Sequence, residues 1–213
     1  MNKRLIRKIN RQTIERYNVR LLKFGQNPRS LGWDSRGNQN ERFKAAMRLY
    51  DFRGKRICDI GCGFADFYGY LLKNKVIPKS YTGIDINKNL IAKARADYPN
   101  CRFIRRDILL KPFKKPNFDC AVMFGVLNFK FNSFGNYVYA EKMIAEALRM
   151  VKEVLIVDML SLYRDKNYPK EDFVFYYSPE RMFKFVQTLT PNAVLKHDYM
   201  PIPQKEFMLY LRK

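Results

Sequence analysis

Short apolar runs alternate with segments of helical periodicity from residue 55 to the end of the chain. The apolar runs predict strands at 56–60, 80–85, 102–106, 118–124 and 153–158. The segments between them predict helices at 65–74, 87–97 and 137–151. Strands that alternate with helices in this way are typical of a mostly parallel sheet with helices on both faces.

The pattern changes near the end of the chain. A last helix is predicted to begin after Ser178, because a serine followed by proline and glutamate supplies an N-cap, a first-turn proline and an early acid. Beyond it, 193–199 and 206–211 predict two strands joined by a turn that contains Pro201 and Pro203. The expected fold is therefore a doubly wound α/β sheet that ends in a hairpin.

The first 25 residues predict a basic amphipathic helix, with eight Lys or Arg against one acid. One face carries the residues at helical spacing, namely Ile6, Ile9, Thr13, Tyr17, Leu21 and Phe24. Packing of this face against the domain is favoured over an arm that binds nucleic acid or a membrane surface. A loop at 25–40 and a helix at 39–52 follow. We divide the chain into an N-terminal helical extension or lid, 1–53, and a main domain, 54–213.

The first predicted strand ends in a glycine-rich turn, ICDIGCGFA at 57–65. Gly61 and Gly63 allow the backbone to approach a ligand closely, and the N-terminus of the following helix offers free N–H groups. The dinucleotide fingerprint GxGxxG needs a third glycine where Asp66 stands, and the charge of Asp66 opposes a pyrophosphate. The turn therefore predicts a cofactor other than NAD.

Acids end three successive predicted strands: Asp59, Asp85 and Asp107. Asp59 can pair with an ammonium group, directly or through water. Asp85, 24 residues after Gly61, is placed to accept the hydroxyls of a ribose, and Asp107 to accept an adenine amino group. A cofactor with a cationic end and an adenosine fits this pattern, and we predict S-adenosyl-L-methionine.

At these residues the chain resembles the class I S-adenosylmethionine-dependent methyltransferases, over 55–213. The motif of that family is an acid followed by GxGxG, and Ala65 stands here in place of the third glycine. The resemblance implies a Rossmann-like, seven-stranded, mostly parallel sheet with an antiparallel last strand. It also implies the cofactor-binding residues: Asp59, Gly61, Cys62 and Gly63 at the turn, Asp85 with Ile86 at the ribose, Asp107 with Ile108 at the adenine, and Phe124 with Gly125 under the methyl group.

A closer likeness is to bacterial methyltransferases encoded near glycan or secondary-metabolite genes. It depends on LGWxSxxxQxxRF at 31–43, GVLNF at 125–129 and KHDYMP at 196–201. In such enzymes the segment before the first strand folds over the cofactor, which makes Trp33, Gln39 and Arg42 candidate lid contacts. Alternatives remain for two of them: Trp33 as a core anchor, the favoured interpretation for a lone tryptophan, and Arg42 as an ordinary surface residue.

Composition limits the class of protein further. A hydrophobic content of 47% predicts a packed body, and the formal charge of +21 attracts anionic partners such as RNA. The four cysteines form no CxxC pair, so neither zinc nor a disulfide framework is predicted. The sequence shows no apolar run of membrane-spanning length, and its first ten residues carry charges where a signal peptide is apolar, so we expect a cytoplasmic protein.

The acceptor is open at this point. The first hypothesis is transfer of a methyl group to an O or N atom of a small molecule or glycan, the second is RNA methylation at a ring nitrogen, and the third is an RNA-binding factor without catalysis. His197, the single histidine, is a weak candidate for the general base, and a structural histidine paired with Asp198 is the favoured alternative. Asp158 and the tyrosines of 137–139 are other candidate bases.

Overall fold

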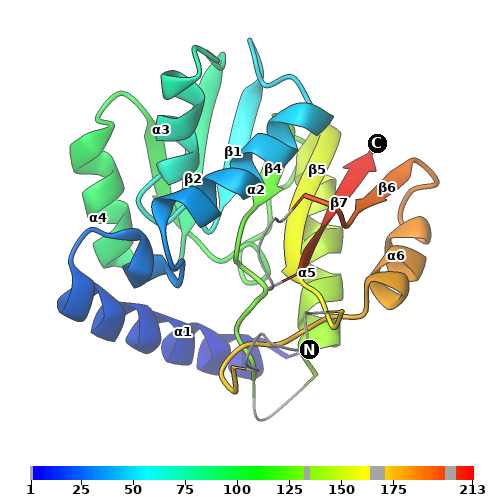
Figure 1. Ribbon diagram of the computed structural model, residues 1–213, viewed down its shortest axis with the longest axis horizontal. Coiled ribbons are helices and arrows are strands. Elements are labelled where there is room, and N and C mark those ends of the chain that lie inside the picture. Colours follow the sequence, from blue (N-terminus) through cyan, green and yellow to red (C-terminus); the bar gives the residue numbers. More distant parts are fainter. Residues whose placement is uncertain (1, 132–134, 164–170, 200–204) are drawn as a thin grey trace.

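The computed structural model describes residues 2–131, 135–163, 171–199 and 205–213. Seven strands form one sheet in the order β3-β2-β1-β4-β5-β7-β6 (Figure 1). The strands are β1 (Arg56–Ile60), β2 (Ser80–Asp85), β3 (Arg102–Arg105), β4 (Phe118–Met123), β5 (Val151–Leu160), β6 (Ala193–Lys196) and β7 (Glu206–Arg212). The neighbours from β3 to β5 pair in parallel, and β7 is antiparallel to both β5 and β6. The predicted seven-stranded sheet with an antiparallel last strand is confirmed.

Helices cover both faces of the sheet. They are α1 (Lys3–Phe24), α2 (Arg36–Leu49), α3 (Asp66–Lys73), α4 (Lys88–Asp97), α5 (Asn136–Met150) and α6 (Pro179–Gln187), with a short 3-10 helix at Pro28–Leu31. Residues of α2, α3 and α4 form one hydrophobic cluster with the strands, and residues of α5 and α6 form a second cluster with them. Two separate clusters are expected when a sheet is covered on each face.

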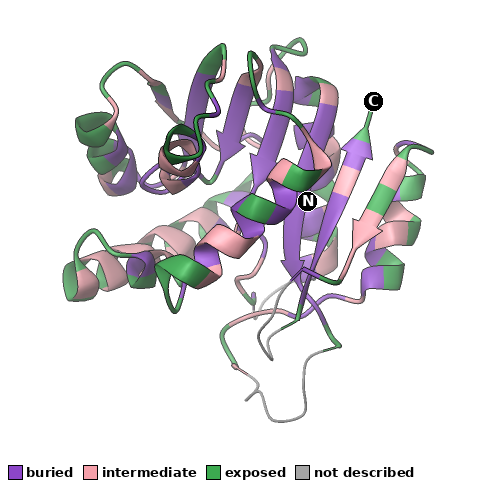
Figure 2. Ribbon diagram, turned by 45° about the horizontal axis from the view of Figure 1, so that its top comes forward, coloured by how far each residue is buried: buried purple, intermediate pink, exposed green. Residues whose placement is uncertain are grey.

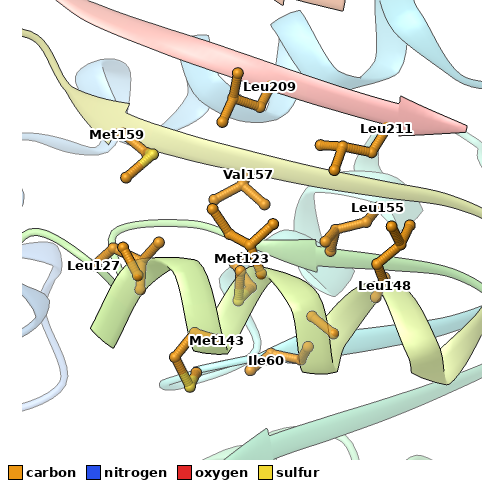
Figure 3. Close-up of a cluster of buried hydrophobic side chains, with 14 of the residues drawn as sticks. Ile60, Met123, Leu127, Met143, Leu148, Leu155, Val157, Met159, Leu209 and Leu211 are labelled. Atoms are coloured by element: carbon orange, nitrogen blue, oxygen red, sulfur yellow. The ribbon is translucent and has the colours of Figure 1, made fainter. Parts of the chain in front are cut away.

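The second cluster fills the space between α5 and the strands β4, β5 and β7. Figure 3 shows Leu148 of α5 facing Leu155 of β5, and Met143 and Val157 belong to the same cluster. Fully burying an aliphatic side chain of this kind stabilises the fold by about 1.5–3 kcal/mol. Figure 2 shows the result, since the central strands are buried along most of their length and the helices are exposed on their outer sides. This core fixes the strand ends that carry the candidate site.

α1 lies across the carboxyl-terminal edge of the parallel strands (Figure 1). Ile6 and Ile9 are buried. The amide of Asn10 donates to Asp107, and the side-chain oxygen of Asn18 accepts from Asn87 at the start of α4. Helix α1 therefore packs against the domain, which is the favoured of the two predicted roles. Within the described residues no helix combines the length and the hydropathy that a membrane span needs.

The structure corrects several predicted boundaries. α2 begins at Arg36 rather than 39 because the Ser35 hydroxyl accepts the N–H of Asn38 and caps the helix, so Gly37 lies in its first turn instead of a loop. β5 extends at both ends beyond the predicted 153–158. β6 ends at Lys196, before the predicted end at 199. The predicted turn with Pro201 and Pro203 lies outside the described residues.

The N-cap predicted for the last helix is confirmed. Ser178 precedes α6, and its hydroxyl accepts the N–H of Arg181. Pro179 occupies the first turn, where a missing N–H costs nothing, and Glu180 follows it near the positive end of the helix dipole.

Candidate active site

A cavity opens at the carboxyl ends of β1, β2 and β4, between these strands and α1. We call it the first cavity; it has about 1080 Å³ of empty space, with open solvent at its entrance included. Eleven of the predicted site residues line it: Trp33, Asp59, Gly61, Cys62, Gly63, Asp85, Ile86, Asp107, Ile108, Phe124 and Gly125. Gln39 also lines it. The fold therefore gathers these residues around one space of the size of a nucleoside ligand.

The backbone conformation of the turn after β1 requires glycine at positions 61 and 63. Gly61 and Gly63 both have positive φ, 75° and 55°, in the region that other residues rarely adopt. A Cβ atom on Gly61 would lie 2.5 Å from Cγ2 of Val126. Ala65 keeps a φ of 62° although it carries a side chain, so the position of the missing third glycine retains a left-handed conformation. This turn forms the edge of the first cavity.

The Asp85 carboxylate is held rigidly at the end of β2. Its Oδ2 accepts the N–H of Gly63 at 3.1 Å, and its Oδ1 accepts the N–H of Asn87 at 2.8 Å. Burial raises the pKa of Asp85, and these backbone hydrogen bonds oppose the shift. Asp85 thus connects the glycine turn to the start of α4 and still lines the cavity.

Asp59 is buried at the end of β1 and accepts a hydrogen bond from the Tyr81 hydroxyl. Burial raises its pKa to about 7, the hydrogen bond from Tyr81 opposes this shift, and the nearby charges of Asp85 and Asp66 add to it. Near neutral pH this carboxyl is therefore close to its midpoint, and a cation beside it would favour the ionised form.

Asp107 follows β3, and its carboxylate already accepts hydrogen bonds from other residues of the protein. Its Oδ1 accepts the N–H groups of Leu109 and Leu110, and its Oδ2 accepts the amide of Asn10 at 2.5 Å. The side-chain oxygen of Asn10 is buried and has no hydrogen-bond partner in the part of the chain that the structure describes. An unsatisfied acceptor of this kind usually indicates a missing donor, such as a ligand group or water.

Gly125 and Trp33 meet where β4 ends. Gly125 has a φ of 70°, and a Cβ atom on it would lie 2.8 Å from two ring carbons of Trp33. The N–H of Gly125 donates to Oδ1 of Asp158 at 2.6 Å. Trp33 is buried and lines the first cavity. Its ring therefore both packs against Gly125 and contributes to the wall of the cavity.

Arg42 lies in a buried ion cluster rather than in the first cavity. Its Nε is 3.4 Å from Oδ2 of Asp158, it forms a second ion pair with Glu206, and its guanidinium stacks on Trp33 at 4.2 Å. The side chain is 3% exposed, so Arg42 is not a surface residue. Burial and the charge of Glu206 raise the pKa of Asp158 to about 7, and Arg42 opposes this shift.

A second cavity adjoins the first, with about 870 Å³ of empty space including open solvent. Both cavities are lined by Tyr17, Leu31, Trp33, Gly125 and Phe129. The second cavity is more polar, and its other lining residues include Arg16, Arg20, Asn38, Arg42, Asn128, Glu171 and Glu206. Gly125, which the resemblance places under the methyl group, therefore faces both spaces.

His197 follows β6 and lines neither cavity. Its ring lies near the rings of Tyr163 and Phe207, with centroids 6.2 and 6.1 Å away. Burial lowers its pKa. Asp198, its expected structural partner, pairs with Lys196 at 2.7 Å. The geometry thus does not bring His197 to the other candidate residues.

Sequence reasoning missed two contributions to the site. α1 supplies Thr13, Ile14 and Tyr17 to the first cavity. The amphipathic face that predicted packing was the available signal, because Thr13 and Tyr17 lie on it. The other missing residue is Glu206, the partner of Arg42 from the far end of the chain, and no local pattern marks that pair.

The residues around the first cavity fit S-adenosylmethionine. Three carboxylates at strand ends suit an ammonium group and neutral hydrogen-bond donors, and they oppose a phosphate. Ile60, Ile86 and Ile108 supply apolar surface for a base.

Comparisons with known proteins point to a methyltransferase domain. Residues 57–155 match the family model described as methyltransferase domain. A fatty-acid O-methyltransferase from Mycolicibacterium smegmatis is 32% identical over 74 residues, which cover 34% of this chain and only 27% of that protein. A demethylmenaquinone methyltransferase from Chlorobaculum tepidum is 26% identical over 203 residues, which cover 85% of this chain and 83% of that protein.

Solved structures share the fold. Magnesium protoporphyrin IX methyltransferase from Synechocystis PCC 6803, with bound SAH, has a TM-score of 0.68 at 14% identity and covers 100% of both chains. An S-adenosylmethionine-dependent methyltransferase from Mesorhizobium loti has a TM-score of 0.61 at 13% identity and covers 81% of this chain and 98% of that chain. Residues 57–155 thus match a methyltransferase domain, and the chain has the fold of S-adenosylmethionine-dependent methyltransferases.

Proposed function

We propose that the first cavity holds S-adenosylmethionine through the acids at the three strand ends. Asp59 pairs with the ammonium group, Asp85 accepts the ribose hydroxyls, and Asp107 with Ile108 holds the adenine. The cofactor supplies a methyl group on a sulfonium. The observation that supports this assignment is that all of these side chains line one cavity around the glycine turn.

The extension 1–53 acts in this proposal as a lid. The first cavity is lined by Tyr17 of α1, by Trp33 before α2 and by Gln39 in α2, and Gln39 donates to Asp66 at 3.0 Å. Methyl transfer from a sulfonium is aided mainly by alignment of the acceptor and exclusion of water. Asp158 contributes as a positioning residue, because it fixes the N–H of Gly125 at the junction of the two cavities.

The acceptor is a small molecule or glycan unit that enters the second cavity and receives the methyl group on an O or N atom. The single observation that carries this proposal is the shared wall at Gly125, which places a second polar cavity directly beside the cofactor cavity. The relatives named above act, by their names, on a fatty acid and on demethylmenaquinone, both of them small molecules.

RNA is the second candidate acceptor, supported by the net charge of +21. The exposed side of α1 carries several basic residues, Lys3, Arg4, Arg7, Lys8 and Arg11. Such a surface attracts phosphates without specifying a site of methylation.

Transfer of labelled methyl from S-adenosylmethionine to a size-fractionated extract of the source organism tests these candidates. A small-molecule or glycan acceptor gives labelled product that resists ribonuclease. Label that elutes with RNA and is lost on ribonuclease treatment would contradict the first proposal and support the second. Deletion of residues 1–25 is not a useful control here, because Tyr17 lines the cofactor cavity.

The pKa of Asp59 makes cofactor binding depend on pH. Because the carboxyl of the free protein has a pKa of about 7 and a ligand ammonium favours its ionised form, affinity is expected to fall as the pH drops below 7. The expected loss between pH 8 and pH 6 is about tenfold, measured by calorimetry with S-adenosylhomocysteine. In Asp59→Asn the affinity at pH 8 should be lower and the pH dependence nearly absent. A wild-type affinity that is unchanged over this range would contradict the pairing.

A further inference from the structure

The second cavity contains an arginine held between two aromatic rings. The guanidinium carbon of Arg16 lies 4.3 Å from the ring centroid of Phe173 and 5.0 Å from that of Phe129. All three residues line the cavity. Stacking of a guanidinium between rings restricts its orientation and leaves its N–H groups to point outward in one plane.

Arg16 differs from the other two arginines of this cavity in having no bonded partner among the residues that the structure describes. Arg42 is paired with two buried carboxylates, and Arg20 donates to the carbonyl oxygen of Arg29. Arg16 forms neither an ion pair nor a hydrogen bond within the described ranges. Glu171 interacts with it electrostatically but lies beyond ion-pair distance.

Three acids line this cavity, Asp34, Glu171 and Glu206, and among the described residues none of them forms an ion pair with Arg16. Glu206 is engaged by Arg42. Asp34 is exposed to solvent. Arg16 is half-buried, so part of its guanidinium is shielded from water, and this burial lowers its pKa. A partly desolvated cation without a partner gains from an anion that can replace the missing water.

We propose that the acceptor carries an anionic group, a carboxylate or a phosphate, and that Arg16 binds this group in the second cavity. The proposal rests on the proposed function, since it concerns the acceptor of the same site. The planar fork of N–H donors of an arginine matches both anions. Phe129 lies between Arg16 and the cofactor cavity, because its ring stacks on Arg16 and the residue also lines the first cavity. Arg16 is therefore a specificity-determining residue that fixes one end of the acceptor while the other end reaches Gly125.

A binding experiment on the full chain tests this role of Arg16 with small probes that differ in charge. Trp33 is the only tryptophan and lines both cavities, so its fluorescence reports on ligands in either space. The protein saturated with S-adenosylhomocysteine is titrated with four probes: benzoate, phenyl phosphate, benzamide and benzyl alcohol. We expect benzoate, phenyl phosphate or both to bind at least tenfold more tightly than the neutral probes, the size expected for a charge-assisted hydrogen bond.

Variants of Arg16 test whether this residue causes the preference for anionic probes. Arg16→Gln should remove the preference for anionic probes, and Arg16→Lys should keep part of it because the charge remains. Arg11→Gln is the matched control, since Arg11 lies on the same helix, is exposed and lines neither cavity. Affinity for S-adenosylhomocysteine should be unchanged in Arg16→Gln, because Arg16 does not line the first cavity. Equal affinity for all probes, or a preference that survives Arg16→Gln, would overturn the inference.

The extract experiment separates this inference from the proposed function. Labelled small-molecule products should be retained by an anion-exchange resin, because the anionic group that Arg16 binds lies away from the atom that receives the methyl group. Labelled small molecules that are neutral would refute the role of Arg16 and leave the proposed function intact. Label found only in RNA would refute the proposed function, and the probe titrations would still show whether Arg16 forms an anion site.

Discussion

Replacing Arg42 by methionine is expected to lower the free energy of unfolding by about 3–5 kcal/mol at pH 8. The guanidinium is the only cation in the ion cluster with Asp158 and Glu206, as far as the described residues extend, and both carboxylates are fully buried. Methionine would fill similar space and leave two buried acids without a positive partner. Urea unfolding followed by circular dichroism measures the change.

Arg36→Met is the matched control for this prediction. Arg36 lies on the same helix and also pairs with an aspartate, Asp66, but its side chain is 55% exposed. An exposed pair contributes less than about 1 kcal/mol, so the two variants separate the effect of burial from that of losing an arginine. Adding Glu206→Gln to Arg42→Met should recover part of the lost stability by removing one buried charge. Equal losses in the Arg42 and Arg36 variants would show that the cluster is not a major source of stability.

The pH dependence of the Arg42 variant follows from the raised pKa of Asp158. A carboxyl whose pKa is about 7 in the folded protein, against 3.8 ordinarily, holds its proton more tightly in the folded state. Its ionisation therefore lowers stability as the pH rises from about 4 through 7. Without Arg42 the pKa should rise further, so Arg42→Met should lose less stability at pH 5.5 than at pH 8. A loss that is independent of pH would point to packing rather than charge.

Much of the lining of the first cavity could be predicted from the sequence because its signals are local. Acids at or just after the ends of the first three strands are visible in the sequence, and parallel strands place their carboxyl ends at one edge. Asp59, Asp85 and Asp107 accordingly line one cavity. The glycines were equally informative, since Gly61 and Gly63 line the first cavity, where a close approach of the backbone to a ligand was expected.

The remaining features depend on contacts between distant segments. Arg42 and Glu206 are 164 positions apart, and the sequence around Arg42 predicts a helix and a lid contact but not this ion pair. His197 is the one histidine, which drew attention to it, but its place after β6 keeps it out of both cavities. Arg16 had only its position on a basic helix to mark it, because Phe129 and Phe173 lie in segments far along the chain. The roles of single residues outside the strand ends could therefore be assigned only from the structure.

Asp85→Ala is expected to weaken the binding of S-adenosylhomocysteine by at least tenfold. In the proposed complex the carboxylate of Asp85 accepts both ribose hydroxyls, and a hydrogen bond to a charged group contributes about 1.5–3 kcal/mol. The carboxylate needs no rearrangement before binding, because the N–H groups of Gly63 and Asn87 already hold it in place. Calorimetry measures the affinity, and Asp51→Ala, which removes an exposed acid that lines neither cavity, serves as the control.

The same two backbone bonds create an alternative explanation that the experiment must separate. Removing Asp85 frees the N–H groups of Gly63 and Asn87 and could weaken binding by loosening the glycine turn. A second ligand separates the two explanations, namely S-adenosylhomocysteine without its two ribose hydroxyls, called here the dideoxy compound. The wild-type protein should bind the dideoxy compound poorly. Asp85→Ala should bind S-adenosylhomocysteine and the dideoxy compound with similar affinity. If Asp85→Ala still prefers the natural ligand by the wild-type factor, the ribose hydroxyls are recognised elsewhere and Asp85 only supports the turn.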